Sequence, residues 1–344
     1  MTQSSSPQQE LQQQAGKILS QVAGYVGIKT LEIGLKSGLL EEIARHPQGI
    51  TADDLAKQRG FDSLYTQVWC RSAYAAEVLD LGEGNTFKLA PHMETLLLNQ
   101  DSPGYVGGLP MVFTQPDMFD VLAQNLASGE RTWWDKASPG WIQGVSNTGR
   151  PFYTRLIPGG LSGVPGLDDK LAEGGLIADL SCGAGIGLVK LANNYQNCSI
   201  VGVDGDAYSL ELARELLGKE GVQDRTTLVV SSLEELNVSD EYDVALNNIS
   251  MHECRDIEKS TANIYRALKA DGYFVISDFS FPESIEDCRT VPARIMSGIQ
   301  FFEATIDDQL QPVKTYVDLL NRHGFRNVDV IQINPLHALT FGQK

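Results

Sequence analysis

The hydrophobic positions follow two different patterns in the two parts of the chain. From residue 15 to residue 40, apolar side chains recur at the spacing of amphipathic helices, and two further helices are predicted over residues 51–60 and 63–81. From residue 176 onward, short apolar runs alternate with helical patterns. This alternation predicts a parallel sheet whose strands are connected by right-handed helical crossovers.

The sheet is predicted to contain seven strands and to end in a hairpin. The apolar runs that predict strands lie at residues 176–178, 199–203, 227–230, 242–246, 273–277, 327–333 and 338–342. The last two are joined by residues 334–337, a connection short enough for an antiparallel pair. Because ligands of open α/β sheets bind beyond the carboxyl ends of the strands, every candidate site residue is expected to follow a strand.

The length of 344 residues predicts more than one domain. We expect a Ser- and Gln-rich disordered tail over residues 1–14, a mainly helical domain over residues 15–105, a helical connector and substrate lid over residues 106–160, and an α/β domain over residues 161–344. The last boundary, near residue 160, follows the Pro- and Gly-rich stretch 158–166, which is typical of a linker. The tail lacks the apolar core of a signal peptide.

The order of elements in the N-terminal domain is that of a winged helix. Helix, turn and helix are followed by a turn at residues 82–85 and a short predicted strand at residues 86–89. Such modules often bind DNA, but residues 1–100 contain 8 Lys and Arg against 11 Asp and Glu, and the whole chain has a formal charge of -17. Phosphate binding needs the opposite sign, so neither nucleic acid nor a membrane surface is expected as a partner. The apolar helix faces are expected to pack on a second subunit or over the catalytic site.

A glycine-rich segment follows the first predicted strand of the sheet. Residues 179–187 read Asp-Leu-Ser-Cys-Gly-Ala-Gly-Ile-Gly, and Asp204 ends the next strand. Glycine allows positive φ angles and close approach of a ligand to the backbone, and an acid at this second position can accept both hydroxyls of a ribose. The dinucleotide fingerprint Gly-x-Gly-x-x-Gly fails here, because Leu188 or Lys190 stands where its third glycine belongs. The segment predicts a nucleoside site of another kind.

With a cysteine before its first glycine, this segment resembles the first motif of the class I S-adenosylmethionine-dependent methyltransferases. From about residue 15 the chain is similar to the small-molecule O-methyltransferases that carry an N-terminal winged-helix dimerisation domain. The resemblance implies an α/β fold with a Rossmann-like seven-stranded sheet whose last strand is antiparallel. It also implies S-adenosyl-L-methionine as the cofactor and a homodimer formed through the N-terminal domain.

The candidate cofactor-binding residues all follow predicted strands. They are Asp179, Ser181, Gly183, Gly185, Asp204, Gly205, Ser231, Ser232, Leu233, Asn247 and Asn248. By the resemblance, Asp204 would bind the ribose, Gly205 would approach the adenine, and carbonyls around Asn247 would hold the methionine ammonium group. Many family members have Asp where this chain has Ser232, so the contact with the adenine edge departs from the family pattern.

His252 is the candidate general base. The pair His252-Glu253 follows the fourth strand and resembles the His-acid pair of the O-methyltransferases. Imidazole can take a proton from a hydroxyl near neutral pH, although orientation of the reactants can itself supply much of the rate. Asp278, and after it Glu303, are the candidate acids that fix the tautomer of the histidine. The alternatives are a hydrogen-bonded histidine at a helix start and ordinary capping or solvated carboxylates.

Aromatic and methionine side chains flank these positions and predict a hydrophobic or aromatic acceptor. The candidate pocket residues are Trp141, Phe152, Tyr153, Met251, His252, Phe279 and Met296, with Trp133, Trp134, Phe301 and Phe302 in the same set. The other four histidines are expected at the surface or in packing. Five scattered cysteines without paired spacing indicate reduced thiols in a cytoplasmic protein and no metal site.

The predicted function is methyl transfer to a hydroxyl of a hydrophobic small molecule. Two alternatives keep the same fold. One is an enzyme that uses the bound sulfonium for cyclisation, decarboxylation or hydroxylation, and the other is an S-adenosylmethionine-sensing winged-helix regulator. The acidic N-terminal domain argues against the regulator.

Overall fold

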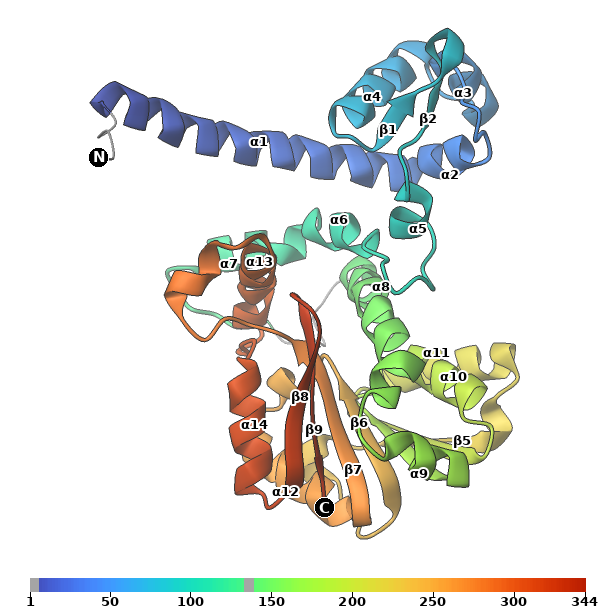
Figure 1. The fold of residues 1–344 in the computed structure, drawn as a ribbon, viewed down its shortest axis with the longest axis vertical. Helices are drawn as coiled ribbons and strands as arrows, with labels where there is room; N and C mark the ends of the chain where they lie inside the picture. The colour runs from blue at the N-terminus through green and yellow to red at the C-terminus, as the bar shows by residue number, and fades with distance from the viewer. Residues whose placement is uncertain (1–5, 133–138) are drawn as a thin grey trace. The chain divides into compact units, whose positions relative to one another are not determined.

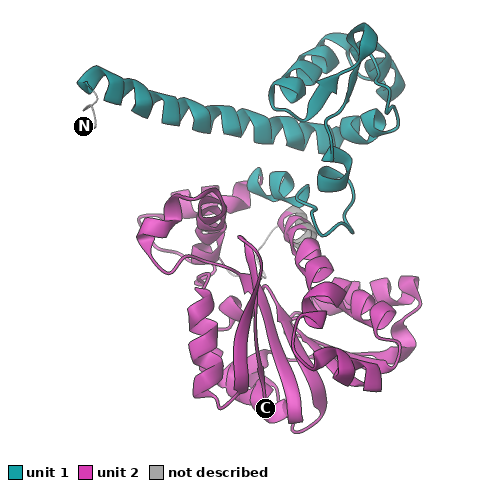
Figure 2. Ribbon diagram, viewed as in Figure 1, with its two compact units in different colours: residues 1–114 teal, residues 115–344 magenta. Residues whose placement is uncertain are grey.

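The computed structural model describes residues 6–132 and 139–344 of the chain (Figure 1). The chain divides into two compact units, residues 1–114 and 115–344 (Figure 2). This division falls inside the connector expected over residues 106–160, and not near residue 160. Within the described ranges, no helix is both long enough and apolar enough to span a membrane.

The first unit begins with a long helix, α1 (Pro7–Ser37), which is followed by α2 (Leu39–Ala44). Ser6 and Gln9 form a capping box at the start of α1, and Gly38 ends the helix with a φ of 72°. Residues 7–14 are therefore helical, which corrects the expectation of a disordered tail for that stretch. Ser6-Pro7 is a helix-start signal that the Gln-rich composition obscured.

Two capped helices and a small hairpin complete the core of the first unit. They are α3 (Ala52–Arg59), α4 (Ser63–Ala75), β1 (Leu79–Leu81) and β2 (Phe87–Leu89), followed by α5 (Met93–Leu97) and α6 (Gly108–Phe113). The Thr51 and Asp62 side chains accept hydrogen bonds from the first turns of α3 and α4, as expected. The helix predicted up to residue 81 ends at Ala75, because residues 79–81 pair with β2 instead. The order of elements is that of the expected module.

The second unit is built on a seven-stranded sheet. Its strands are β3 (Gly175–Leu180), β4 (Cys198–Asp204), β5 (Thr226–Val230), β6 (Tyr242–Asn248), β7 (Leu268–Phe279), β8 (Arg326–Asn334) and β9 (His337–Gln343). Their order is β5-β4-β3-β6-β7-β9-β8, and β9 runs antiparallel to both of its neighbours. The predicted α/β fold with an antiparallel last strand is confirmed.

Helices cover both faces of this sheet (Figure 1). One layer contains α8 (Pro139–Arg155), α9 (Leu167–Glu173), α10 (Ile186–Asn194) and α11 (Ala207–Glu220), and the other contains α12 (Ile257–Ala267) and α14 (Val313–Arg322). The short α7 (Asp120–Asn125) contacts α13 (Val291–Thr305). Neighbouring strand residues such as Ile177 and Ala178 belong to different core layers, as the alternation of a strand requires.

The strand order reverses between β3 and β6. From β3 the chain crosses toward β4 and β5, whereas from β6 it crosses toward β7. The carboxyl ends of these two central strands therefore border the crevice in which ligands of such sheets bind.

Candidate active site

The glycine-rich loop after β3 has the backbone shape that its sequence predicts. Gly183 has a φ of 50°, Gly185 has a φ of 85°, and Ser181 also has a positive φ, of 63°. A Cβ atom on Gly183 would meet no atom within 4 Å, so the loop leaves open space on this side. Gly187, which sequence analysis did not single out, is needed for close packing, since its Cβ would lie 2.3 Å from an Asp179 oxygen.

Asp204 ties the end of β4 to this loop. One of its carboxylate oxygens accepts a hydrogen bond of 2.8 Å from the backbone amide of Gly183, and the other accepts one of 2.9 Å from the amide of Asp206. Burial raises the pKa of Asp204, although both amide hydrogen bonds oppose this. The carboxylate therefore lies where β3 and β4 end, held by neutral donors.

Asp179 lies fully buried at the end of β3. Its two oxygens accept hydrogen bonds of 3.1 Å from the hydroxyl of Tyr153 on α8. Burial raises the pKa of Asp179 to about 7. Tyr153, a candidate for the acceptor pocket, is thus bound to the glycine-loop acid.

Asn247 and Asn248 end β6 beside this loop. The amide of Asn247 donates to the carbonyl of Leu180 at 3.1 Å, and the side-chain oxygen of Asn248 accepts a hydrogen bond of 2.7 Å from Ser277. Among the described residues, the Asn247 Oδ1 and the Asn248 Nδ2 are buried and have no hydrogen-bond partner. These two atoms are available to polar groups of a ligand.

The segment Ser231–Leu233 follows β5 and lies next to the end of β4. The amide of Ser231 donates to the carbonyl of Asp204 at 2.9 Å, and Leu233 is buried. A Cβ on Gly205 would lie 3.7 Å from the backbone of Ser232. Both loops therefore stand at the same edge of the sheet, as predicted.

His252 and Asp278 come together at the ends of β6 and β7. The Nδ1 of His252 lies 2.9 and 3.1 Å from the two carboxylate oxygens of Asp278, and both side chains are buried. Asp278 also accepts hydrogen bonds of 2.7 Å from the hydroxyl of Tyr316 and from the amide of Phe279. These contacts orient the imidazole and direct its Nε2 away from Asp278.

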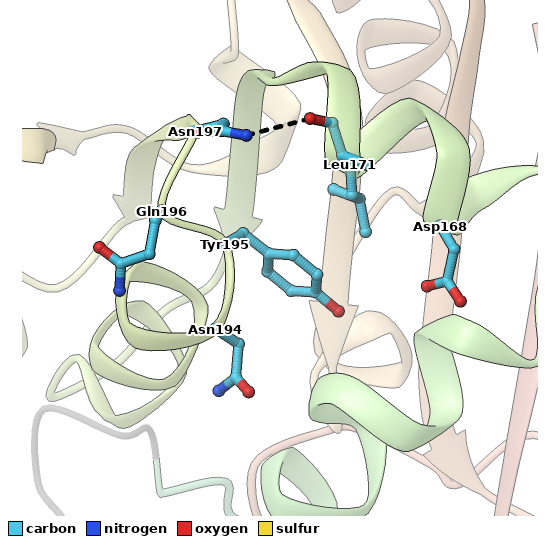
Figure 3. A pocket seen from close by; sticks show the side chains of 7 residues that line it. Asp168, Leu171, Asn194, Tyr195, Gln196 and Asn197 are labelled. Carbon is cyan, nitrogen blue, oxygen red and sulfur yellow. Dashed lines mark hydrogen bonds between the residues drawn. The ribbon is translucent and has the colours of Figure 1, made fainter.

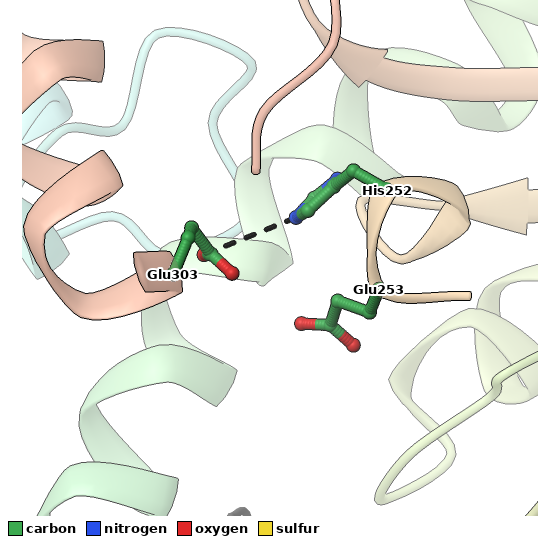
Figure 4. Close-up of side chains that lie close together, drawn as sticks. All are labelled: His252, Glu253 and Glu303. Atoms are coloured by element: carbon green, nitrogen blue, oxygen red, sulfur yellow. Dashed lines mark ion pairs between the residues drawn. The ribbon is translucent and has the colours of Figure 1, made fainter. Parts of the chain in front are cut away.

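Glu303 and Glu253 face the other side of the imidazole (Figure 4). Glu303, on α13, has one carboxylate oxygen 3.9 Å from the Nε2 of His252. One ring nitrogen of His252 and one carboxylate oxygen from each of Glu253 and Glu303 lie within 4.8 Å of one another. Burial lowers the pKa of His252, but Asp278 and then Glu303 raise it well above its ordinary value. Burial and the charge of Glu303 raise the pKa of Glu253. The three candidate catalytic residues, His252, Asp278 and Glu303, thus form one cluster with Glu253.

Aromatic rings surround part of this cluster. The centroid of the Phe279 ring lies 6.1 Å from that of His252 and 5.0 Å from that of Phe152. Trp141 packs on Phe302 with 4.2 Å between the ring centroids. Met251, by contrast, belongs to the hydrophobic core beneath the sheet, and Met296 is also buried. Trp133 and Trp134 lie outside the described residues.

His337, expected at the surface or in packing, is fully buried and packs near the site. Its Nε2 lies 2.8 Å from the hydroxyl of Ser277, its Nδ1 accepts a hydrogen bond from Arg155, and its ring packs on Phe152. Burial and the charge of Arg155 lower the pKa of His337 to about 3. It therefore stays neutral and connects the wall of the site to Asn248 through Ser277.

A separate hollow of about 330 Å³ lies at the opposite edge of the sheet (Figure 3). It is lined by Asp168, Leu171, Ala172, Asn194, Tyr195, Gln196 and Asn197. These residues belong to α9, to the end of α10 and to the turn that enters β4, at the amino ends of the strands. Because ligands of such sheets bind beyond the carboxyl ends, this hollow is not a candidate for the active site.

Comparison with known proteins identifies the fold of the second unit. Residues 178–276 match the family model of a methyltransferase domain. The chain is 26% identical over 103 residues to the malonyl-[acyl-carrier protein] O-methyltransferase of Priestia megaterium, a match that covers 30% of this chain and 36% of that relative.

Two solved structures show the same architecture over nearly the whole chain. An O-methyltransferase family protein from Burkholderia thailandensis is 15% identical, with a TM-score of 0.73 and coverage of 96% of this chain and 98% of that one. Human N-acetylserotonin methyltransferase, in complex with S-adenosylmethionine, is 14% identical, with a TM-score of 0.68 and coverage of 100% and 99%. The expected class I methyltransferase fold is confirmed.

Proposed function

We propose that this chain, which has the class I methyltransferase fold and a methyltransferase domain, transfers a methyl group from S-adenosyl-L-methionine to a hydroxyl of a hydrophobic or aromatic small molecule. The observation that carries the proposal is the pairing of His252 with Asp278 beside the glycine-rich loop. This pairing supports His252 as the base, because His252 follows β6 and ligands of such sheets bind beyond the carboxyl ends of the central strands.

The residues at the ends of β3, β4 and β6 fit this cofactor. Gly183 borders open space, Asp204 is an acceptor for ribose hydroxyls, and the buried Asn247 Oδ1 has no partner among the described residues. An orphaned acceptor and a carboxylate suit the ammonium group and the ribose of the cofactor. The bound cofactor supplies an electrophilic methyl group, and the neighbouring residues hold and orient it.

His252 acts as the base in this proposal. Its Nδ1–H donates to Asp278, which leaves the lone pair of Nε2 to accept the proton of the acceptor hydroxyl. Asp278 then stabilises the imidazolium, and the Tyr316 hydroxyl holds Asp278 in place. Orientation of the hydroxyl and removal of its proton both contribute to the rate.

The first unit supplies the surface of a homodimer in our proposal. Residues 11–26 of α1 include apolar side chains that are more than half exposed, namely Leu11, Ile18, Leu19, Val22, Tyr25 and Val26. An exposed stripe of this kind suits a second copy of the chain. A Leu19→Glu/Val22→Glu double variant should shift the sedimentation coefficient from dimer to monomer, whereas Lys17→Glu should leave it unchanged.

The free, partly or fully buried cysteines also favour a cytoplasmic location.

Product mass tests the proposed reaction. The protein is incubated with S-adenosylmethionine and a panel of hydroxylated aromatic compounds, and products are analysed by mass spectrometry. We expect a product that has gained one methylene, with S-adenosylhomocysteine released in equal amount. A product without an added methyl group would instead support a cyclisation, decarboxylation or hydroxylation and would refute methyl transfer.

A further inference from the structure

The cluster around His252 contains more carboxyl groups than the charge of one imidazolium can neutralise. Asp278, Glu303 and Glu253 contribute carboxyl groups, and Asp308 adds a fourth just after α13, where its amide donates to the Glu303 carbonyl at 2.8 Å. Burial and the charge of Glu303 raise the pKa of Asp308 to about 7. Like charges at this density disfavour one another unless a positive group joins them.

One oxygen of Glu303 points independently to a ligand. Glu303 is only 5% exposed, and its Oε2 is buried with no hydrogen-bond partner in the described part of the chain. The side chain extends toward His252 and Glu253 (Figure 4). A buried carboxylate oxygen without a donor is costly, so a ligand that donates a hydrogen bond there is favoured.

The positive charge available to these acids is lowest just before the acceptor is deprotonated. His252 and Arg255 lower the pKa of Asp308, and His252 also opposes the raised pKa of Glu253. A base must be neutral before it takes a proton. In that state His252 no longer compensates Glu303, and an outside cation is needed most.

Aromatic rings adjoin the same carboxylates. Phe302 directly precedes Glu303 on α13 and packs on Trp141, and Phe279 lies beside His252. Faces of aromatic rings attract ammonium groups, so rings and acids together favour a cationic ligand over a neutral one.

We propose that the acceptor carries a protonated nitrogen next to the hydroxyl that is methylated, as in a vicinal amino alcohol or an ortho-aminomethyl phenol. The spacing sets this arrangement: Glu303 lies 3.9 Å from the Nε2 that receives the hydroxyl proton, so the cation binds within a few atoms of the hydroxyl. Glu303 and Asp308 bind the cation, and the apolar wall holds the rest of the molecule. This inference rests on the proposed function and adds the substrate class.

Three phenols that differ only in the ortho group test this inference. 2-Hydroxybenzylamine, 2-hydroxybenzyl alcohol and salicylate carry a cation, a neutral hydroxyl and an anion, respectively. Each is titrated by calorimetry into full-length protein that is saturated with S-adenosylhomocysteine and free of divalent metal. We expect the amine to bind at least about tenfold more tightly than the alcohol, and salicylate to bind weakest.

Charge-removing variants locate the effect. Glu303→Gln and, more moderately, Asp308→Asn should shrink the preference for the amine to less than about threefold. Glu283→Gln removes the same charge at an exposed position and should leave the preference unchanged. Unaltered binding of S-adenosylhomocysteine shows that each variant is folded.

Several outcomes would overturn the inference. They are equal binding of the amine and the alcohol, absence of binding by all three phenols, and a preference that survives in Glu303→Gln. Stoichiometric Mn²⁺ binding that is lost in Glu303→Gln and displaces the amine would also overturn it, by assigning the cluster to a metal. The titration involves no turnover, so a cation preference without any methylated product would refute the proposed function but would still support the binding of a cationic ligand by Glu303 and Asp308.

Discussion

The two sides of the strand-order reversal both hold buried or partly buried carboxylates, but they hold them differently. On the β3–β4 side, Asp179 and Asp204 accept hydrogen bonds from a tyrosine hydroxyl and from backbone amides, all of them neutral donors. On the β6–β7 side, Asp278 instead pairs with the titratable ring of His252. The first arrangement provides no positive charge of its own, whereas the second contains a group that can carry one.

This difference indicates which half of the site depends on its ligand. Burial raises the pKa of both Asp179 and Asp204, so their ionised forms gain most when a cationic cofactor arrives. His252, by contrast, has a raised pKa because its acids are already in place. We therefore expect the first half to respond to cofactor and the second half to respond to pH.

Loss of the proposed base should have the largest effect. His252→Ala removes the proton acceptor, so kcat/KM should fall about 10²- to 10⁴-fold while the Kd for S-adenosylmethionine stays within about twofold. Steady-state kinetics and calorimetry measure the two quantities. His46→Gln, a change in the first unit, serves as the control. Retention of more than a third of the wild-type activity would exclude His252 as the base.

Loss of the proposed ribose acceptor, Asp204, should impair cofactor binding on the β3–β4 side. Asp204→Ala removes a charged acceptor for two hydroxyls, and we expect the Kd for S-adenosylmethionine to rise about 100-fold in calorimetry. Asp204→Asn keeps an acceptor beside Gly183 and should lose less. Asp224→Ala changes an exposed acid and is the matched control, and NADH should not bind to the wild type. Unchanged affinity in Asp204→Ala would place the nucleoside elsewhere.

The pH profile of kcat/KM should distinguish the β6–β7 side of the site from the β3–β4 side. His252 must be neutral to act, so the acid limb of kcat/KM should lie above pH 6.5, where its pKa has been raised. Asp278→Asn removes a charge that favours the imidazolium, and it should move this limb to lower pH and reduce kcat/KM about tenfold. Tyr316→Phe leaves Asp278 with less hydrogen bonding and should move the limb slightly upward. A limb that moves in neither variant would mean that another group titrates.

The smallest effect is expected on stability without cofactor. Asp179 has a pKa of about 7 in the folded state, above its ordinary value near 4, so folding loses stability as pH rises between these values. Asp179→Asn keeps an acceptor for Tyr153 but cannot ionise, and its Tm at pH 8 should exceed that of the wild type by about 3 °C. Asp169→Asn, on the surface of α9, is the control. A lower Tm in Asp179→Asn would show that the ionised form is stabilised without ligand.

The sequence predicted the parts of the site that depend on local pattern. The glycine loop, the strand ends and the hairpin at residues 334–337 follow from turn residues and apolar runs, so their positions could be read directly. His252 and Asp278 were also predicted, because each follows a strand. Their hydrogen bond depends on β6 and β7 being neighbours, a pairing between segments that are apart in the chain.

Other residues could not be predicted because their role depends on distant packing. Tyr316 lies on the amphipathic helix α14, where its sequence context is that of any core residue, and His337 follows a turn. Asp308 comes within the cluster only because α13 ends beside His252. The helix predicted to residue 81 is too long for a related reason, since the mainly apolar residues 78–81 suit a helix or a strand until β2 supplies a pairing partner.

The position of β9 sets an order for the folding of the second unit. β9 lies between β7 and β8 although it follows both in the chain, so β8 has no place in the sheet until β9 has paired with β7. Strands β3 to β7 can assemble earlier, and until then β7 presents an unpaired edge that is open to wrong partners. Insertion of β9 closes that edge and brings His337 against Phe152 in the same step. The wall of the candidate active site is therefore completed last, and we expect a chain arrested before this step to be prone to aggregate.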